Sequence, residues 1–124
     1  LVKKGAFSAF YYFAIKLAKQ RGVKKIDFGG VRSFFNDGLF QYKKKWGMKA
    51  DHYHIVTDVT GFSMVKDSLD FKEFLVDNPF IGLDKNGRLV WYVFVSEDID
   101  DETKMEYEEE LFTPGVNECR FIKL

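Results

Sequence analysis

The chain has 124 residues, a hydrophobic content of 46% and a formal net charge of zero at pH 7. This length corresponds to one domain or to a piece of one, and the hydrophobic content excludes a disordered chain. No apolar run approaches the roughly 20 residues that cross a bilayer, so no membrane span is expected.

The charges are unevenly distributed along the chain. Residues 1–50 contain twelve lysines and arginines but only two acids, Asp27 and Asp37, which leaves seven basic and seventeen acidic residues in 51–124. A basic first part is typical of a surface for phosphates, coenzyme A or RNA. We prefer the interpretation that the acidic part packs beside the basic part, because the two charges cancel within one chain.

The first expected helix covers residues 9–21. Phe10, Phe13 and Leu17 recur at three- and four-residue spacing, which is typical of the apolar face of a helix. Neighbouring aromatic residues widen this face, so the helix is expected to be largely covered by core contacts. Ser8 is the expected N-cap.

A short strand is predicted at 23–28, directly after this helix. Ile26 and Phe28 would point to one face of the strand, as alternation in a strand requires. Gly29 and Gly30 would then turn the backbone sharply and allow a close approach, because neither residue carries a Cβ.

A second, shorter helix is predicted at 38–46. Asp37 is its expected N-cap, since its side chain can accept hydrogen bonds from the first backbone N–H groups of the helix. Leu39, Tyr42 and Trp46 are expected to face inward, and the three consecutive lysines of this helix to face mostly outward.

The remaining expected elements are a strand at 48–60, a helix at 70–77, a hairpin with strands at 80–83 and 88–96, a helix at 101–111 and a last strand at 116–124. Asn86-Gly87 is a typical turn pair for the hairpin. These elements predict an α+β, α/β-like fold, in which a mixed sheet is flanked by helices. A division near 61–67 would separate a part at 1–60 from a hairpin-containing extension at 61–124 that packs on the same domain.

Two short motifs occur in order: Asp-Phe-Gly-Gly at 27–30 and Tyr-Lys-Lys-Lys-Trp-Gly at 42–47. Together with the preceding helix, they resemble the C-terminal half of a GNAT-like acyltransferase domain, most closely that of the Fem-type peptidoglycan amino-acid transferases. Those enzymes show Asp-Phe-Gly-Gly and then Phe-Lys-x-x-Phe-Gly, so Tyr42 and Trp46 stand at the two phenylalanine positions. The resemblance covers about residues 5–60, under half of the chain.

The resemblance implies acyl transfer to an amine, with an acyl-coenzyme A or an aminoacyl-tRNA as the donor. Lys43 would lie near the acyl group, beside Gly29 and Gly30, where a cation stabilises developing negative charge. Asp27 would act as a general base or an orienting group, or else would cap the glycine turn by accepting N–H bonds. The N-terminus of the helix that starts at Ser8 would face the pyrophosphate of coenzyme A.

A second interpretation is a non-catalytic interaction module that derives from such a domain. Only one glycine lies in 2–7, where coenzyme A users carry a glycine-rich loop, and the first strands of such a domain would precede Leu1. Because the chain begins with Leu rather than Met, we expect a fragment of a longer enzyme. The missing glycine loop and first strands favour the alternative, a module that fills the missing part of its sheet as a homodimer. RNA binding by the basic part is a third interpretation.

Other candidate chemistry is less supported by the sequence. His52 and His54 would share one face of the strand at 48–60, but no third metal ligand is obvious, so we expect no metal site. Cys119 is the single cysteine, which excludes an intrachain disulfide and suits a reducing, cytoplasmic location. No histidine lies near it in the sequence, so we do not expect it to be a nucleophile.

Overall fold

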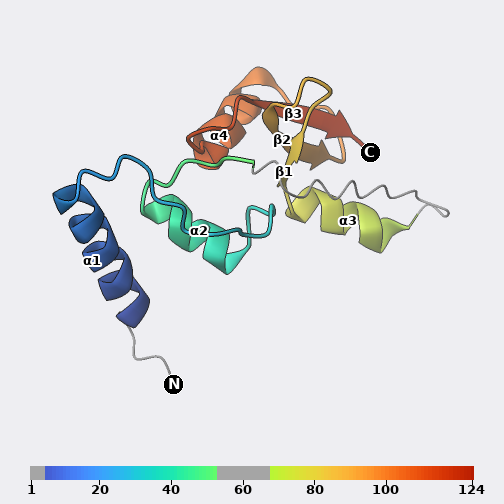
Figure 1. Cartoon of the computed structure of the whole chain (residues 1–124). Helices are drawn as coiled ribbons and strands as arrows, with labels where there is room; N and C mark the ends of the chain where they lie inside the picture. Colours follow the sequence, from blue (N-terminus) through green and yellow to red (C-terminus); the bar gives the residue numbers. More distant parts are fainter. Residues whose placement is uncertain (1–4, 53–67) are drawn as a thin grey trace. The chain divides into compact units, whose positions relative to one another are not determined.

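The computed structural model of the chain describes residues 5–52 and 68–124. The chain forms two compact units, Leu1–Gly30 and Val31–Leu124. In chain order the elements are α1 (Ala6–Gln20), α2 (Gly38–Lys45), α3 (Leu69–Asp77), β1 (Phe80–Leu83), β2 (Leu89–Val95), α4 (Asp101–Leu111) and β3 (Glu118–Lys123) (Figure 1). These helices and a three-stranded mixed sheet within the described residues confirm the predicted α+β class. The division predicted near 61–67 lies outside the described residues.

The first unit contains α1, which begins earlier than predicted. Its N-cap is Gly5, with φ at 97° and no side-chain cap, so the prediction of Ser8 as the N-cap is wrong. Glycine adopts this left-handed conformation without a steric penalty, and the chain therefore turns into the helix before Ser8. The expected covering of the helix is also wrong: Tyr11 is its one buried residue, and its ring centroid lies 4.6 Å from that of Phe28.

The strand predicted at 23–28 does not form, and residues 23–30 have no regular secondary structure. The Asp27 side chain instead accepts a hydrogen bond from the backbone N–H of Gly29, at 2.7 Å. Such a local bond offers the backbone an alternative to a strand ladder. Gly29 has φ at 77°, which ends any extended run there.

The second unit begins with the segment that leads into α2. Asp37 caps this helix as predicted, and Tyr42 and Trp46 are half-buried, but the predicted orientation is wrong for Leu39, which is 48% exposed, while Phe40 and Lys43 are buried. The reason is the aromatic core, because the Phe40 ring packs edge-on against Trp91 with the centroids 5.5 Å apart. This contact sets which side of α2 faces inward.

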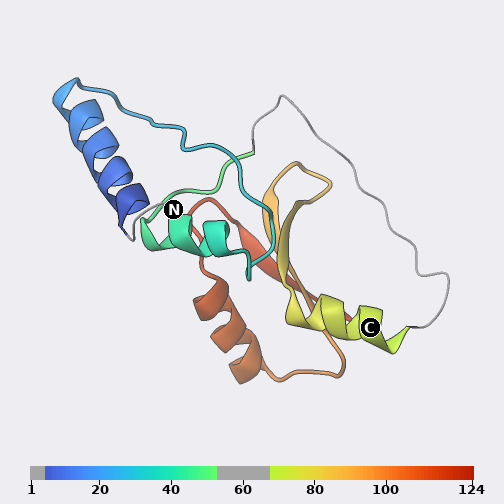
Figure 2. The same cartoon turned by 90° about the horizontal axis from the view of Figure 1, so that it is seen from below.

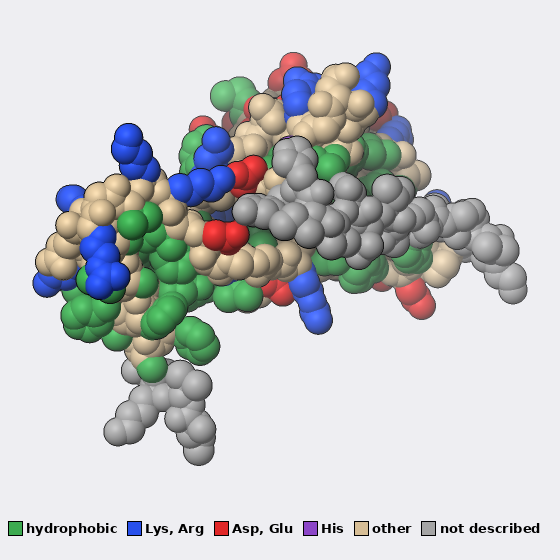
Figure 3. Space-filling model, viewed as in Figure 1, with side chains coloured by type: hydrophobic (Ala, Val, Ile, Leu, Met, Phe, Trp, Pro, Cys, Tyr) green, Lys and Arg blue, Asp and Glu red, His purple; other side chains and the backbone are tan. Residues whose placement is uncertain are grey.

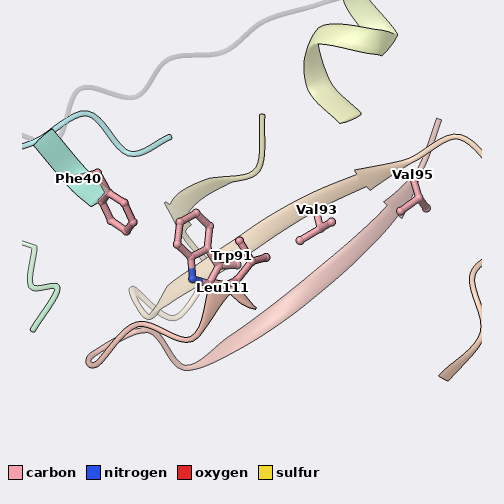
Figure 4. Close-up of a cluster of buried hydrophobic side chains, with 5 residues drawn as sticks. All are labelled: Phe40, Trp91, Val93, Val95 and Leu111. Carbon is pink, nitrogen blue, oxygen red and sulfur yellow. The ribbon is translucent and has the colours of Figure 1, made fainter. Parts of the chain in front are cut away.

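The sheet has the strand order β1-β2-β3, with β1 antiparallel and β3 parallel to β2. Trp91, Val93 and Val95 alternate along β2 and are buried with Phe40 of α2 and Leu111 of α4 in one cluster (Figure 4). On the other face, Phe80 stacks on Tyr92 and Phe94. Accordingly α2 and α4 lie on one side of the strands and α3 on the other (Figure 2). β2 therefore packs on both of its faces.

The C-terminal elements agree with the sequence. The helices at 70–77 and 101–111, the hairpin and the last strand are confirmed, with end differences of one or two residues for most elements. Of the strand predicted at 48–60, residues 48–52 have no regular structure and the rest lies outside the described residues.

The hairpin turn is organised by Asp84, whose side chain is fully inaccessible to solvent. Its Oδ1 accepts hydrogen bonds from the backbone N–H groups of Asn86 and Arg88, at 2.8 and 2.9 Å. Its Oδ2 accepts from the guanidinium groups of Arg88 and Arg120, at 2.9 and 3.2 Å. The hydrogen bond from the Arg88 backbone N–H is the main reason why the pKa of Asp84 lies well below its ordinary value.

Replacement of Asp84 by asparagine is therefore expected to lower the thermal midpoint of unfolding at pH 7. A depressed pKa in the folded state contributes stability above the unfolded pKa, and this contribution is lost as pH falls toward the folded pKa. The difference between wild type and Asp84→Asn should therefore shrink below about pH 4. Thermal unfolding by circular dichroism at pH 7, 4 and 2 measures it, with Glu97→Gln at an exposed position as the control. An equal difference at every pH would contradict the assignment.

Candidate functional site

Lys43, the cation implied by the resemblance, belongs to the second unit. The Asp37 carboxylate accepts hydrogen bonds from the backbone N–H groups of Leu39 and Phe40, at 3.0 and 2.9 Å, and so starts α2 at Gly38. Lys43 then falls three residues after Phe40 and shares its inward side. It is 8% exposed, so the sequence-based expectation of an outward lysine is wrong and the side chain lies within the fold.

The end of α2 carries the aromatic residues of the second motif. The rings of Tyr42 and Trp46 meet edge-on with their centroids 6.5 Å apart, and the backbone N–H of Trp46 donates to the Lys43 carbonyl at 3.1 Å. Gly47 has φ at 69°, the left-handed conformation that commonly ends a helix. The second motif therefore forms a single capped helix end with Lys43 buried inside it.

Lys44 is a half-buried cation that the sequence does not distinguish from its neighbours. Its Nζ donates to the backbone carbonyl of Glu110 and lies 4.7 Å from the centroid of the Phe35 ring. Burial lowers the pKa of Lys44, and the Glu110 charge partly offsets this effect. No sequence signal reveals this role, because Glu110 lies 66 residues away along the chain. Lys44 thus connects α2 to the end of α4.

Asp27 and the glycine pair belong to the first unit. The hydrogen bond from Gly29 to the Asp27 side chain confirms the structural role predicted for this carboxylate, that of capping the glycine turn. A Cβ at Gly29 or Gly30 would meet no atom within 4 Å. Position 29 therefore requires glycine because of its φ of 77° and not because of a close neighbour. The expected close approach of another group to the glycine pair stays a prediction.

The predicted site residues are thus distributed over both units. Ser8, Asp27 and the glycines at 29 and 30 lie in Leu1–Gly30, whereas Lys43 lies in Val31–Leu124. The structure describes the local geometry of each group. The expected position of Lys43 beside the glycine pair stays a prediction, as does the role of the α1 N-terminus toward a pyrophosphate.

The described residues give no support for a metal site at the histidines or for a nucleophilic role of the cysteine. His54 lies outside the described residues, and residues 5–52 and 68–124 contain no group of three potential metal ligands. Burial raises the pKa of the Cys119 thiol to about 11, and the nearby Glu108 charge adds to this effect. A thiol with this pKa is a poor nucleophile near neutral pH.

The outer side of α4 carries an open hollow lined by Met105, Glu108, Glu109 and Phe112. The side chains of Met105 and Phe112 are 62% and 69% exposed. It is therefore a surface depression, unlike the enclosed pockets that usually bind small molecules.

No family model, curated protein or solved structure matches this chain significantly. Within residues 5–52 and 68–124, no helix combines the length and the apolar character that a membrane span requires.

Proposed function

We propose that this chain contributes to acyl transfer to an amine, with an acyl-coenzyme A or an aminoacyl-tRNA as the donor substrate. One observation carries the proposal: the motif at 27–30 is followed in order by the motif at 42–47, as in GNAT-like and Fem-type transferases. The buried Lys43 in a helix capped by Asp37 is compatible with it. A cytoplasmic location belongs to the same proposal, since both donors and a single unpaired cysteine suit a reducing compartment.

The proposed chemistry is attack of an amine nitrogen on the acyl carbonyl carbon. The carbonyl oxygen then becomes negatively charged, and the Lys43 ammonium would stabilise this charge. The amine gives up a proton, for which the Asp27 carboxylate that also caps the glycine turn is the proposed acceptor. The thiolate of coenzyme A or the ribose oxygen of tRNA leaves when the carbonyl reforms and takes up that proton. Gly29 and Gly30 would allow the donor substrate to approach the backbone closely, because they have no side chain.

Calorimetric titration of the full chain with acetyl-coenzyme A, and separately with charged tRNA, tests the proposal. We expect saturable binding of one of the two donors and acyl transfer to an amine acceptor in a product assay. Uncharged tRNA and free coenzyme A serve as controls for recognition of the acyl group. Absence of binding to both donors would contradict the proposed function.

A non-catalytic interaction module is the second candidate, and one specific observation favours it. Several large apolar side chains of α1 are exposed, Phe10 and Phe13 at 63% and 62%, which is typical of a surface that contacts a partner. This candidate includes a homodimer, which size-exclusion chromatography with light scattering would detect. A monomer with measured transferase activity would rule the candidate out.

A further inference from the structure

One side of α1 carries large apolar side chains. Phe7, Phe10, Phe13 and Leu17 follow one another at three- and four-residue spacing and therefore share a face of the helix. We call these four residues the α1 apolar face. Their side chains are 62%, 63%, 62% and 47% exposed. The ring of Tyr11, the buried residue of the helix, lies against Phe28 instead.

The charges around this face have one sign. α1 contains no acidic residue; at 100° per residue Lys19 lies opposite the apolar face, and Lys16 lies at its border beside Phe13. Further exposed cations follow the helix at Arg21, Lys24 and Lys25. Figure 3 shows hydrophobic side chains gathered over α1 together with Lys and Arg side chains. Within the described part of this unit, the single acid, Asp27, is already engaged in the glycine turn.

We propose that α1 binds flat on the surface of an anionic lipid bilayer. An amphipathic helix with bulky apolar residues on one face and lysines on the other buries its apolar face at the headgroup boundary. The cations reach the anionic headgroups by extending along the surface. At 15 residues, the helix is about 22 Å long, too short to span a bilayer and suited to lie on it.

Charge and apolarity together favour lipid over the other occupants. A nucleic acid would satisfy the cations but would leave four large apolar side chains in water. A second copy of α1 would cover the apolar face but would supply no acid to pair with Lys16 and Lys19, because the helix contains none. An anionic bilayer satisfies both features at once. The proposal does not depend on the acyl-transfer function.

Co-sedimentation of the full chain with vesicles tests this proposal. We expect binding to phosphatidylglycerol–phosphatidylcholine vesicles, weaker binding at high salt, and little binding to phosphatidylcholine alone. The double variant Phe10→Ser, Phe13→Ser should reduce the partition coefficient by about tenfold or more, and so should Lys16→Gln with Lys19→Gln. All four residues are exposed, so their replacement should not disturb the fold. Circular dichroism verifies that the variants stay folded.

Matched controls lie in the second unit. Phe112→Ser removes an aromatic side chain that is 69% exposed, and Lys85→Gln removes an exposed cation of the hairpin turn. Both should leave vesicle binding unchanged. The proposal is overturned if the full chain does not bind anionic vesicles, or if the control variants lose binding as much as the α1 variants. Oligomers that require Phe10 and Phe13, without vesicle binding, would overturn it as well and assign the face to a second copy.

Discussion

Replacement of Leu111 by alanine is expected to lower the free energy of unfolding by about 2–5 kcal/mol, the usual range for a buried leucine. Leu111 is 1% exposed and lies in the cluster with Phe40, Trp91 and Val93 (Figure 4). It is the last residue of α4 and the only fully buried one in that helix. The substitution would leave a cavity beside Trp91 and loosen the attachment of α4 to the sheet.

The adjacent residue provides the matched control. Phe112 is 69% exposed, so Phe112→Ala should change the free energy of unfolding by no more than about 0.5 kcal/mol. Urea unfolding followed by tryptophan fluorescence and by far-ultraviolet circular dichroism measures both variants, and Trp91 reports on the cavity directly. Equal losses for the two variants would contradict the core placement of Leu111.

Much of the second unit is predictable because its chemistry is local. Asp84, Asn86 and Gly87 set the hairpin turn within four residues, and the continuous apolar run of β2 is typical of a strand that packs on both faces. Helix starts at Ser68 and Asp100 are likewise encoded by a side chain that accepts a hydrogen bond from the backbone N–H three residues later. Such local signals do not depend on contacts with distant parts of the chain.

Apart from the start of α1, which Gly5 sets locally, the wrong predictions concern features that depend on distant partners. The alternation of Ile26 and Phe28 indicates a strand, but a strand needs a neighbour to bond with, and the Asp27–Gly29 turn is available locally. The inward side of α2 is set by Trp91, which lies far along the chain from Phe40. Apolar spacing within the helix alone cannot reveal this contact.

The candidate site divides in the same way. The bond between Asp27 and Gly29 spans two residues and follows from the known behaviour of aspartate before glycine. The burial of Lys43 depends instead on which side of α2 meets the sheet. Its proposed position beside the glycine pair is a long-range feature, and it rests on the resemblance and not on local chemistry.

Lys43→Met is expected to reduce kcat/KM for acyl transfer by about 100- to 1000-fold, the usual cost of removing a group that stabilises a developing oxyanion. Methionine has a similar length and an apolar side chain, so it suits a position that is 8% exposed. The free energy of unfolding of the same variant shows whether a loss of rate comes with a loss of stability. Initial rates of transfer and urea unfolding on the same preparation measure the two quantities.

Two further variants distinguish a catalytic Lys43 from a structural one. Lys45→Gln removes an exposed cation from the same helix and should leave the transfer rate unchanged, because its charge is solvated. Lys43→Arg keeps the cation in a bulkier form and should retain part of the rate if charge is what matters. If Lys43→Met unfolds the chain more easily while transfer by the folded fraction stays normal, then Lys43 stabilises the helix packing and the acyl group must be held elsewhere.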